Sequence, residues 1–222
     1  STDQLIRSQW CMQFSDAANL GRYLNEGQNG IKIGDIQNSN SDTLAFGKST
    51  GRGSSREHAQ QAIKGAGIRF VVAASFERIF WENCRNYGIY PIAIDSNIAK
   101  KLIYNEKIRH EELLHSYDKL SHDILSYGGL IPYTKARLEG KVFIPNIETV
   151  KRPMTIAEKI IAKNARTQSG VGTQAVKPGD SLLAKVDKKY AYELQTIVSQ
   201  QVLEEVFGEN IPAIDSKNTW LF

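Results

Sequence analysis

Gly51-Arg52-Gly53-Ser54-Ser55-Arg56-Glu57-His58-Ala59 places glycines, hydroxyls and guanidinium groups directly before the apolar residues of a helical pattern. Ser54 and Glu57 have capping-box spacing, in which a hydroxyl and a carboxylate each accept a hydrogen bond from a backbone N–H at a helix start. We therefore expect a helix to begin just after Ser54. Its free N–H groups and its positive dipole end would favour a carboxylate ligand. The same spacing also fits a tight turn with a good cap and no ligand.

Short apolar runs alternate with helical patterns around this stretch. Expected strands are 31–34, 43–46, 68–73 and 90–94, and expected helices are 14–26, 54–64 and 75–87. Ser75 is the expected N-cap of the last helix, and Gly88 suits the position just after its end. The alternation predicts an α/β fold, a layered β/α sandwich over residues 1–95.

The remaining sequence changes character twice. Residues 96–150 carry leucines and isoleucines at helical spacing in a charged background, and we interpret them as a helical linker. Residues 151–222 predict a small α/β piece. It begins with a second capping box at Thr155 and Glu158, and a turn at 176–180, a strand at 182–186 and a helix at 190–207 follow. The expected domains are therefore 1–95, 96–150 and 151–222.

Composition narrows the possible functions. With 222 residues, 41% of them hydrophobic, the chain can bury one large or two small cores. It has no apolar run of about 18 residues and no signal-peptide pattern, so we expect a cytoplasmic protein with no membrane association. The net charge of +4 is spread along the sequence. This charge gives little support to nucleic-acid binding and suits anionic metabolites.

Metal-ligating residues are sparse. Cys11 and Cys84 are the two cysteines, which is too few for a disulfide framework, a structural zinc or an iron–sulfur cluster. His110, His115 and His122 show no helical pairing with each other. We therefore predict no metal site from this chain's residues.

Three blocks in the first 95 residues resemble a known family. Residues 53–59 are similar to the signature loop of the mobile swivel domain in the aconitase superfamily. Residues 1–6, Ser-Thr-Asp-Gln-Leu-Ile, resemble the opening of 3-isopropylmalate dehydratase small subunits, with Ser1 where that family usually has Asp. Residues 74–80 and 83–88 resemble the family's Ser-Phe-x-x-Ile-Phe and Asn-x-x-x-x-Gly segment. The resemblance implies a swivel-domain fold for this part of the chain.

A second resemblance concerns residues 154–187. Met-Thr-x-Ala-Glu-Lys-Ile, Val-x-Pro-Gly-Asp and Ala-Lys-Val-Asp are similar to the beginning of the large, cluster-bearing subunit of the same dehydratases. The chain thus resembles a small subunit joined to the first part of a large one, the reverse of the order in ordinary aconitases. The family's cluster cysteines lie beyond the matched segment. The resemblance therefore implies that a 4Fe–4S cluster comes from a C-terminal part beyond this chain or from a partner subunit.

The resemblance also implies a reaction and roles for the loop. Aconitase-type hydro-lyases isomerise hydroxy di- or tricarboxylates by removing and re-adding water. Ser54 would act as the base, while Ser55 and Arg56 would bind a substrate carboxylate, which a guanidinium can hold bidentately. The loop-supporting residues would be Gly51, Gly53, Glu57 and His58.

Other positions are assigned by their place in the family pattern. Arg7, Gln9 and Trp10 lie where small subunits carry a substrate-selecting loop, although the usual Pro-x-Arg-Tyr-Leu is absent. Arg52 either adds carboxylate affinity or faces solvent. Glu193 falls near a substrate-binding Gln or His of the large subunit and fits a solvated helix face as well.

Two functions remain open from the sequence. The first is the swivel-domain portion of a 3-isopropylmalate dehydratase-like hydro-lyase, inactive without a cluster-bearing large subunit or domain. The second is a non-catalytic relative that binds a carboxylate or a partner and has lost the cluster domain. An intact Ser54-Ser55-Arg56 set favours the first function.

Overall fold

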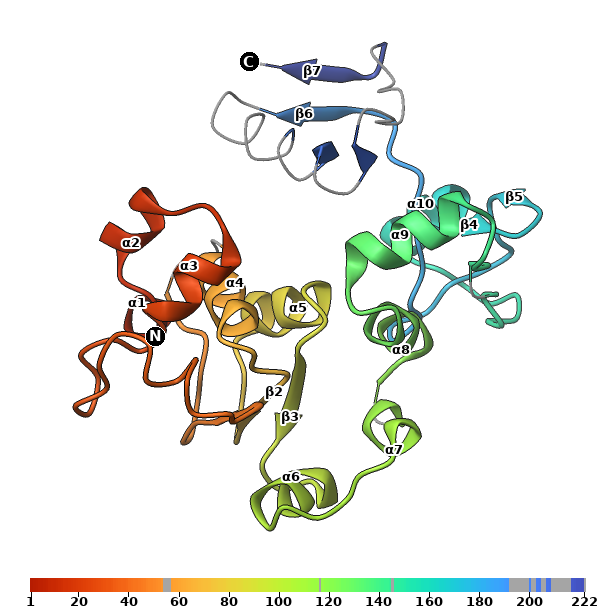
Figure 1. Cartoon of the computed structure of the whole chain (residues 1–222). Helices are drawn as coiled ribbons and strands as arrows, with labels where there is room; N and C mark the ends of the chain where they lie inside the picture. The colour runs from red at the N-terminus through yellow and green to blue at the C-terminus, as the bar shows by residue number, and fades with distance from the viewer. Residues whose placement is uncertain are drawn as a thin grey trace. The chain divides into compact units, whose positions relative to one another are not determined.

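The computed structural model describes residues 1–53, 57–115, 117–144, 146–191, 200, 203–204, 207–208 and 217–221. Ser54, Ser55, Arg56 and Glu193 lie outside the described residues. The chain divides into two compact units, Ser1–Lys141 and Val142–Phe222 (Figure 1). The division at 1–95, 96–150 and 151–222 stays a prediction.

A parallel sheet forms the centre of the first unit. Its strands β1 (Thr43–Ala45), β2 (Phe70–Ala73) and β3 (Tyr90–Ala93) lie in the order β1-β2-β3. The central strand β2 is buried at all four positions, as expected for an apolar run in a covered parallel sheet. Helices α4 (His58–Gly65) and α5 (Arg78–Asn86) connect the three strands. The α/β prediction is confirmed.

One core cluster lies between the sheet and the helices of the N-terminal half. The helices are α1 (Thr2–Leu5), α2 (Ser8–Gln13), α3 (Ala17–Arg22), α4 and α5. The buried residues are Leu5, Ile6, Leu20, Leu24, Ala59, Ala62, Ile63, Ala66, Ile68, Val71, Phe80, Cys84 and Ile89. Gly65 lets α3 and α4 approach closely, because a Cβ on it would lie 1.6 Å from the Ala17 carbonyl oxygen. This cluster includes residues of both α1 and α4, and Gly53 lies against Thr2 of α1.

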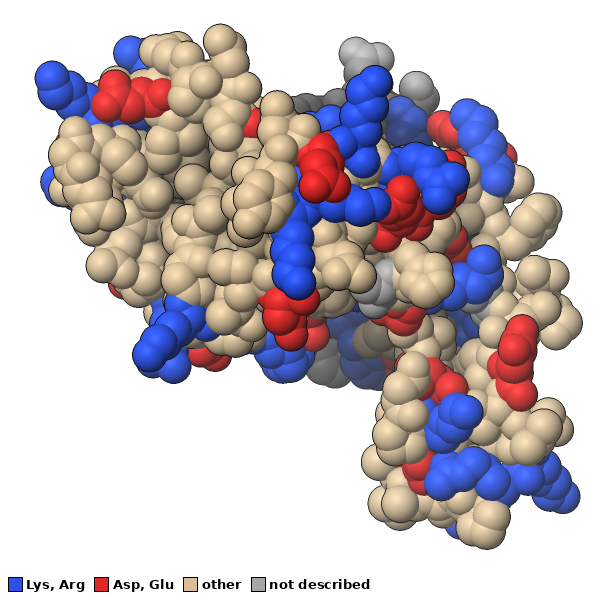
Figure 2. All heavy atoms as spheres, turned by 90° about the horizontal axis from the view of Figure 1, so that it is seen from below, with Lys and Arg blue, Asp and Glu red and all other residues tan. Residues whose placement is uncertain are grey.

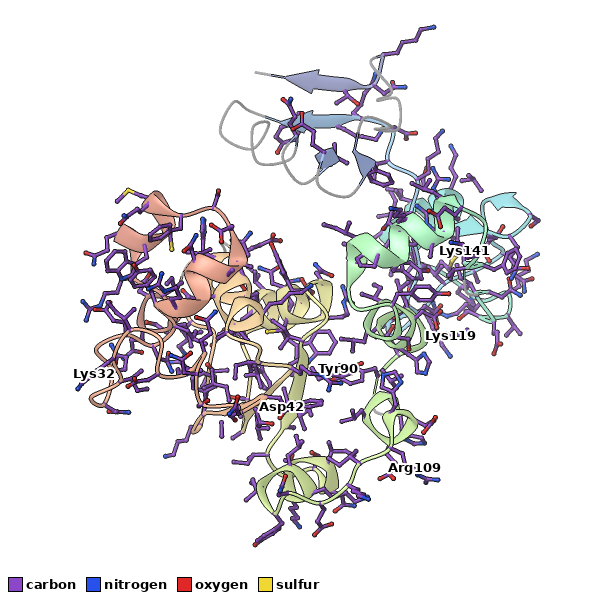
Figure 3. All side chains as sticks on the ribbon, viewed as in Figure 1. Lys32, Asp42, Tyr90, Arg109, Lys119 and Lys141 are labelled. Atoms are coloured by element: carbon purple, nitrogen blue, oxygen red, sulfur yellow. The ribbon has the colours of Figure 1, made fainter. Side chains whose placement is uncertain are left out.

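A second core cluster covers other side chains of the same strands. Phe70, Val72, Tyr90 and Ile92 pack with residues of α6 (Asn97–Ile103), α7 (His110–Leu114) and α8 (Lys119–Ser126). The Tyr117 hydroxyl donates to the Pro91 carbonyl oxygen (2.9 Å), and the Tyr90 hydroxyl lies 3.0 Å from His110 Nε2. Figure 3 labels Tyr90 on β3, and Figure 1 shows α9 (Leu130–Leu138) following α8. The helices predicted as a linker therefore pack on the sheet.

The predictions for residues 31–34 and for Ser75 are wrong. Residues 31–34 contain no strand, and 33–34 lie in a turn. The Gly34 N–H donates to the Arg22 carbonyl oxygen (2.7 Å) and the Lys32 N–H donates to the Asp35 carboxylate (2.8 Å). Ser75 does not cap α5. Its hydroxyl donates to the Lys48 carbonyl oxygen (2.7 Å), and Glu77 is the N-cap. Gly88 follows the helix end with φ +75°, as predicted.

The second unit contains α10 (Ile156–Asn164) and short strands. The predicted capping box of Thr155 and Glu158 is present at the start of α10. Strands β4 (Arg166–Thr167) and β5 (Gly170–Val171) pair antiparallel, and β6 (Lys189–Ala191) and β7 (Thr219–Leu221) pair parallel. The strand expected at 182–186 is reduced to a bridge between Ala165 and Ala184.

The predicted helix at 190–207 lies mostly outside the described residues, and its first two residues belong to β6. Across the described ranges, no helix is long and apolar enough to cross a membrane.

Candidate functional site

The chain reaches the Gly-rich stretch from the carboxyl end of β1. The Phe46 N–H donates to the Val72 carbonyl oxygen (2.7 Å), and Thr50 pairs with Phe76 as a parallel bridge. The Glu77 N–H then donates to the Thr50 carbonyl oxygen (3.0 Å). These bonds fix Thr50, the residue just before the stretch, beside the segment that follows β2. In open α/β sheets, ligands bind at this carboxyl edge of the strands.

Two glycines in this stretch have a steric reason to be glycine. Gly51 has φ +92°, and a Cβ there would lie 2.2 Å from Phe80 Cβ. Gly53 has φ +118°, and a Cβ there would lie 2.7 Å from Thr2 Oγ1. Both conformations are rare for residues with a side chain, and both positions lack space. The backbone therefore packs closely against α5 on one side and α1 on the other.

Helix α1 is bonded to the beginning of the loop. The Thr2 N–H and hydroxyl both donate to the Arg52 carbonyl oxygen, at 2.7 and 3.3 Å. The Arg52 side chain is 74% exposed and pairs with Glu77 at 3.1 Å. An exposed pair of this kind contributes at most about 1 kcal/mol. The structure thus favours the solvent-facing interpretation of Arg52.

The position and the side-chain contact of Glu57 differ from the sequence prediction. Helix α4 begins at His58, and Glu57 is its N-cap, so Glu57 does not hold the N3 position of a capping box. Its carboxylate accepts a hydrogen bond from the Tyr87 hydroxyl (2.9 Å), and that hydroxyl accepts one from Gln61 Nε2 (3.1 Å). The expected capping box is therefore wrong, because a tyrosine from the end of α5 holds the carboxylate.

A small pocket lies where α1, α2 and the start of α4 meet. Its described lining residues are Thr2, Asp3, Ile6, Ser8, Cys11, His58 and Ala59. The site of a Cβ on Gly53 would lie 3.6 Å from Asp3 Oδ2, so the pocket adjoins the loop. Hydroxyl, carboxylate, thiol and imidazole groups stand over an apolar floor, and the pocket has space for about one water molecule.

Two of the predicted substrate-selecting residues, Arg7 and Trp10, lie around Glu26 and not around the pocket. Trp10 Nε1 donates to Glu26 (2.9 Å), Arg7 Nε lies 3.8 Å from the same carboxylate oxygen, and the Trp10 ring stacks on Tyr23 at 4.0 Å. Gln9 is exposed. The pocket lining that the structure describes includes none of the three residues. Instead, α2 presents Ser8 and Cys11 to the pocket.

Asp3 is the pocket residue that sequence reasoning missed. It stands within the opening block Thr2-Asp3-Gln4, which served to identify the family and not to identify a site. Its carboxylate is exposed and lies on the pocket wall beside Gly53. Its place in the opening block that resembles the family was the one available signal, and that block gives no local pattern for a pocket.

The cysteines differ in accessibility. Cys84 is fully buried in the core, and burial raises the pKa of its thiol while a hydrogen bond with Gln60 opposes that shift. Such a thiol is unreactive. Cys11 is half-buried on the pocket wall. Within the part of the chain that the structure describes, no three His, Cys, Asp or Glu residues group as a metal site.

Charge is mixed on the surface. Figure 2 shows one face of the molecule, on which Lys and Arg groups alternate with Asp and Glu groups. No single sign dominates the visible surface. A mixed face of this kind lacks the basic stripe that typifies nucleic-acid binding.

Comparisons with known proteins place the chain in a family. The model of the Aconitase C-terminal domain matches residues 30–97, which include the sheet and the loop. The 3-isopropylmalate dehydratase small subunit of Aquifex aeolicus is 33% identical over 153 residues, covering 63% of this chain and 90% of that protein. The small subunit of Oleidesulfovibrio alaskensis is 36% identical, covering 62% of this chain and 88% of that protein.

A solved structure is also similar. The 3-isopropylmalate dehydratase LeuD from Methanocaldococcus jannaschii aligns with a TM-score of 0.49 and 27% identity, covering 63% of this chain and 89% of that one. The matched relatives are covered almost over their full length, and the family model spans the β1-to-β3 region. The chain therefore belongs to the 3-isopropylmalate dehydratase small-subunit family of the aconitase superfamily.

Proposed function

We propose that this chain supplies the swivel-domain loop of a hydro-lyase that isomerises a hydroxy-dicarboxylate such as 3-isopropylmalate. The observation that carries the proposal is the position of the glycine-rich loop, which follows β1 at the carboxyl edge of the parallel sheet. The chain is also a member of a dehydratase small-subunit family. The substrate class follows from the relatives, which are 3-isopropylmalate dehydratase small subunits.

Residues of the loop would perform the proton transfer and the binding. Ser54 is the proposed base, which removes a proton next to a substrate carboxylate. Ser55 and Arg56 are the proposed carboxylate-binding residues, and a guanidinium suits this role because it forms two parallel hydrogen bonds with a carboxylate. A serine hydroxyl is a weak base in water, so donors at a helix start and a nearby cation must stabilise its anion.

The pocket residues would contact the part of the substrate that lies next to the loop. Asp3 offers an acceptor for a substrate hydroxyl, and the half-buried His58 offers a second polar contact near the start of α4. Gly51 and Gly53 support the loop because their backbone packs against Phe80 and Thr2. We keep Arg7, Gln9 and Trp10 as proposed specificity residues, which lie on or next to α2, the helix whose Ser8 and Cys11 line the pocket.

The residues of this chain do not fit a resident iron–sulfur cluster. The family's cluster would act as a Lewis acid on the leaving hydroxyl. Cubane clusters of this kind are held by cysteine thiolates, whereas one of the two cysteines here is sealed in the core. We therefore propose that the cluster belongs to a large subunit or to a further part of the protein. The chain alone should be inactive.

A further proposal concerns the domain organisation of the chain. Residues 151–222 are proposed to be the beginning of a large-subunit-like domain joined to the swivel domain, with residues 96–150 between the two. The support is the sequence pattern at 154–187 together with the capped helix α10 at its start. We propose a cytoplasmic location, in keeping with a biosynthetic enzyme.

The test measures binding of 3-isopropylmalate to the purified chain by calorimetry. We expect Arg56→Ala to weaken binding at least about tenfold, because a charge-assisted bond of about 1.5–3 kcal/mol is lost. Arg22→Ala is the matched control, since Arg22 is exposed in the last turn of α3, on an element that lines no described part of the pocket. Equal affinities of wild type and Arg56→Ala would remove the loop from any ligand role. Dehydration of 3-isopropylmalate by the chain alone would contradict the need for a partner.

A further inference from the structure

Helix α2, which carries two of the proposed specificity residues, contains no fully buried residue. The N–H groups of Trp10 and Cys11 donate to the Arg7 carbonyl oxygen, at 3.0 and 3.4 Å. The Phe14 N–H donates to the Trp10 carbonyl oxygen (2.9 Å), so these main-chain bonds stay within the segment. A helix this short depends on packing against its surroundings. The position of α2 therefore depends on its side chains.

Two contacts of the Trp10 ring join α2 to the segment at the end of α3. The indole stacks on Tyr23 with 4.0 Å between the ring centroids, and its Nε1 donates to Glu26 Oε2 (2.9 Å). Arg7 Nε, just before the helix, lies 3.8 Å from the same oxygen. One carboxylate thus faces two of the three proposed specificity residues.

The Glu26 carboxylate is held in place by the turn around it. Its side chain is 20% exposed, and the N–H of the preceding Asn25 donates to the Leu5 carbonyl oxygen (2.7 Å) at the end of α1. Gly27 has φ +79°, and a Cβ there would lie 2.3 Å from Arg7 Nη2, so the guanidinium lies against this turn. A bond from the indole to a fixed, charged acceptor is stronger than one between neutral groups.

This bond acts on the rotation of α2 about its axis. Ser8 and Cys11 line the pocket, and their spacing of three residues places them on one face of the helix. Trp10 lies on another face, where it is bonded to Glu26. Holding the indole therefore fixes which side chains of α2 face the pocket.

We propose that Glu26 is a positioning residue, whose bond to the Trp10 indole sets the rotation of α2 and with it the contacts of this helix with the side group of the substrate. The inference rests on the proposed function, because it takes α2 to lie beside the substrate. Glu26 acts through Trp10 and does not itself contact the substrate.

The first readout is the rate at which iodoacetamide alkylates Cys11 in the full chain, which requires no substrate. Cys84 is fully buried, so labelling reports on Cys11. Glu26→Leu removes the acceptor and should speed labelling at least about tenfold, since a hydrogen bond to a charged group that holds α2 is lost. Glu26→Gln keeps an acceptor oxygen and should label clearly more slowly than Glu26→Leu. Equal rates for these two variants would overturn the role of the acceptor.

A double-mutant cycle tests whether Glu26 acts through the indole. Trp10→Phe keeps an aromatic ring for Tyr23 and removes the N–H. Because both substitutions remove one bond, the double variant Trp10→Phe/Glu26→Leu should label within about twofold of the faster single variant. Effects that multiply would show independent roles and overturn the proposal. Glu106→Gln, at an exposed residue between α6 and α7, is the control and should label as wild type does.

The second readout compares the affinities for 3-isopropylmalate and for malate, the same acid without the isopropyl group. Glu26→Leu should weaken binding of 3-isopropylmalate about three- to tenfold and of malate less than about twofold, because the contact with the side group is lost. Equal changes for both ligands would overturn the role in specificity. If wild type binds neither acid, the proposed function fails, and the role of Glu26 toward the substrate fails with it. The labelling rates still decide whether Glu26 holds α2.

Discussion

Gly51 is held in a left-handed conformation directly beneath the core residue Phe80. A Cβ at Gly51 would lie 2.2 Å from Phe80 Cβ, whereas Gly67, with a similar φ of +82°, has open space around it. Gly67→Ala should therefore cost only the backbone strain of about 1–2 kcal/mol. Gly51→Ala must also displace Phe80, which adds about 1–3 kcal/mol. In urea unfolding, Gly51→Ala should have clearly the lower midpoint of the two variants. Equal midpoints would remove the steric role of Gly51.

Single residues show where sequence reasoning succeeds and where it fails. Gly51 and Gly53 could be singled out because a motif names them, and the packing around them gives the physical reason. The partner of Glu57 could not be found, since Tyr87 is 30 positions away and local capping rules compare only near neighbours. Asp3 was visible as a residue but had no local pattern that assigned it to a pocket.

At the scale of elements, the apolar runs were the reliable signal. The run at 68–73 contains β2, whose four residues are all buried between two core clusters, so burial and pattern agree. The pattern at 31–34 failed because the segment lies between turns, with positive φ at Asn29 and Gly30 before it and at Gly34 at its end.

The two predicted capping boxes had different outcomes. The box at Thr155 is confirmed, and the box at Ser54 is wrong. The Glu158 carboxylate accepts hydrogen bonds from the Thr155 N–H and from Arg152. The bond from Arg152 therefore does not disrupt the capping box. The Glu57 carboxylate is bonded instead to Tyr87, far along the sequence. The spacing of two residues therefore predicts a capping box only where the carboxylate is not hydrogen-bonded to a residue far away in the sequence.

Helix α10 gives a prediction about pH. The Glu158 carboxylate accepts bonds from Arg152 and from the Thr155 N–H, and these lower its pKa from the usual 4.5 to about 2. A carboxyl whose pKa is lower in the folded state stabilises that state above about pH 5, and this contribution is lost as pH falls toward 2. We therefore expect the difference in thermal midpoint between wild type and Glu158→Gln to shrink over this range.

Glu148→Gln is the matched control for this pH series, because Glu148 lies in the same unit and outside α10. It measures the effect of removing a carboxylate that takes no part in the capping box of α10. A constant difference between wild type and Glu158→Gln over that range would contradict the assigned role of the carboxylate.

For the whole molecule, the domain boundaries predicted from the sequence differ from the two compact units of the structure. Changes in pattern near residue 95 predicted a swivel domain that ends there, with a linker after it. The structure places both core clusters, including Leu113, Leu114 and Leu125 from beyond residue 95, within the unit Ser1–Lys141. The sequence shows helical spacing in 96–150 but does not show what those helices cover.

Truncation distinguishes the two descriptions. A fragment of residues 1–141 keeps both core clusters, so we expect cooperative thermal unfolding and wild-type affinity for 3-isopropylmalate. A fragment of residues 1–95 loses the helices that cover Phe70, Val72 and Ile92, and exposed apolar surface of this kind promotes association. It should unfold at lower temperature and aggregate. Two fragments with the same midpoint and the same affinity would mean that residues 96–141 contribute little to folding and act as a linker. A shorter fragment that is less stable would mean that these helices are part of the domain that carries the loop.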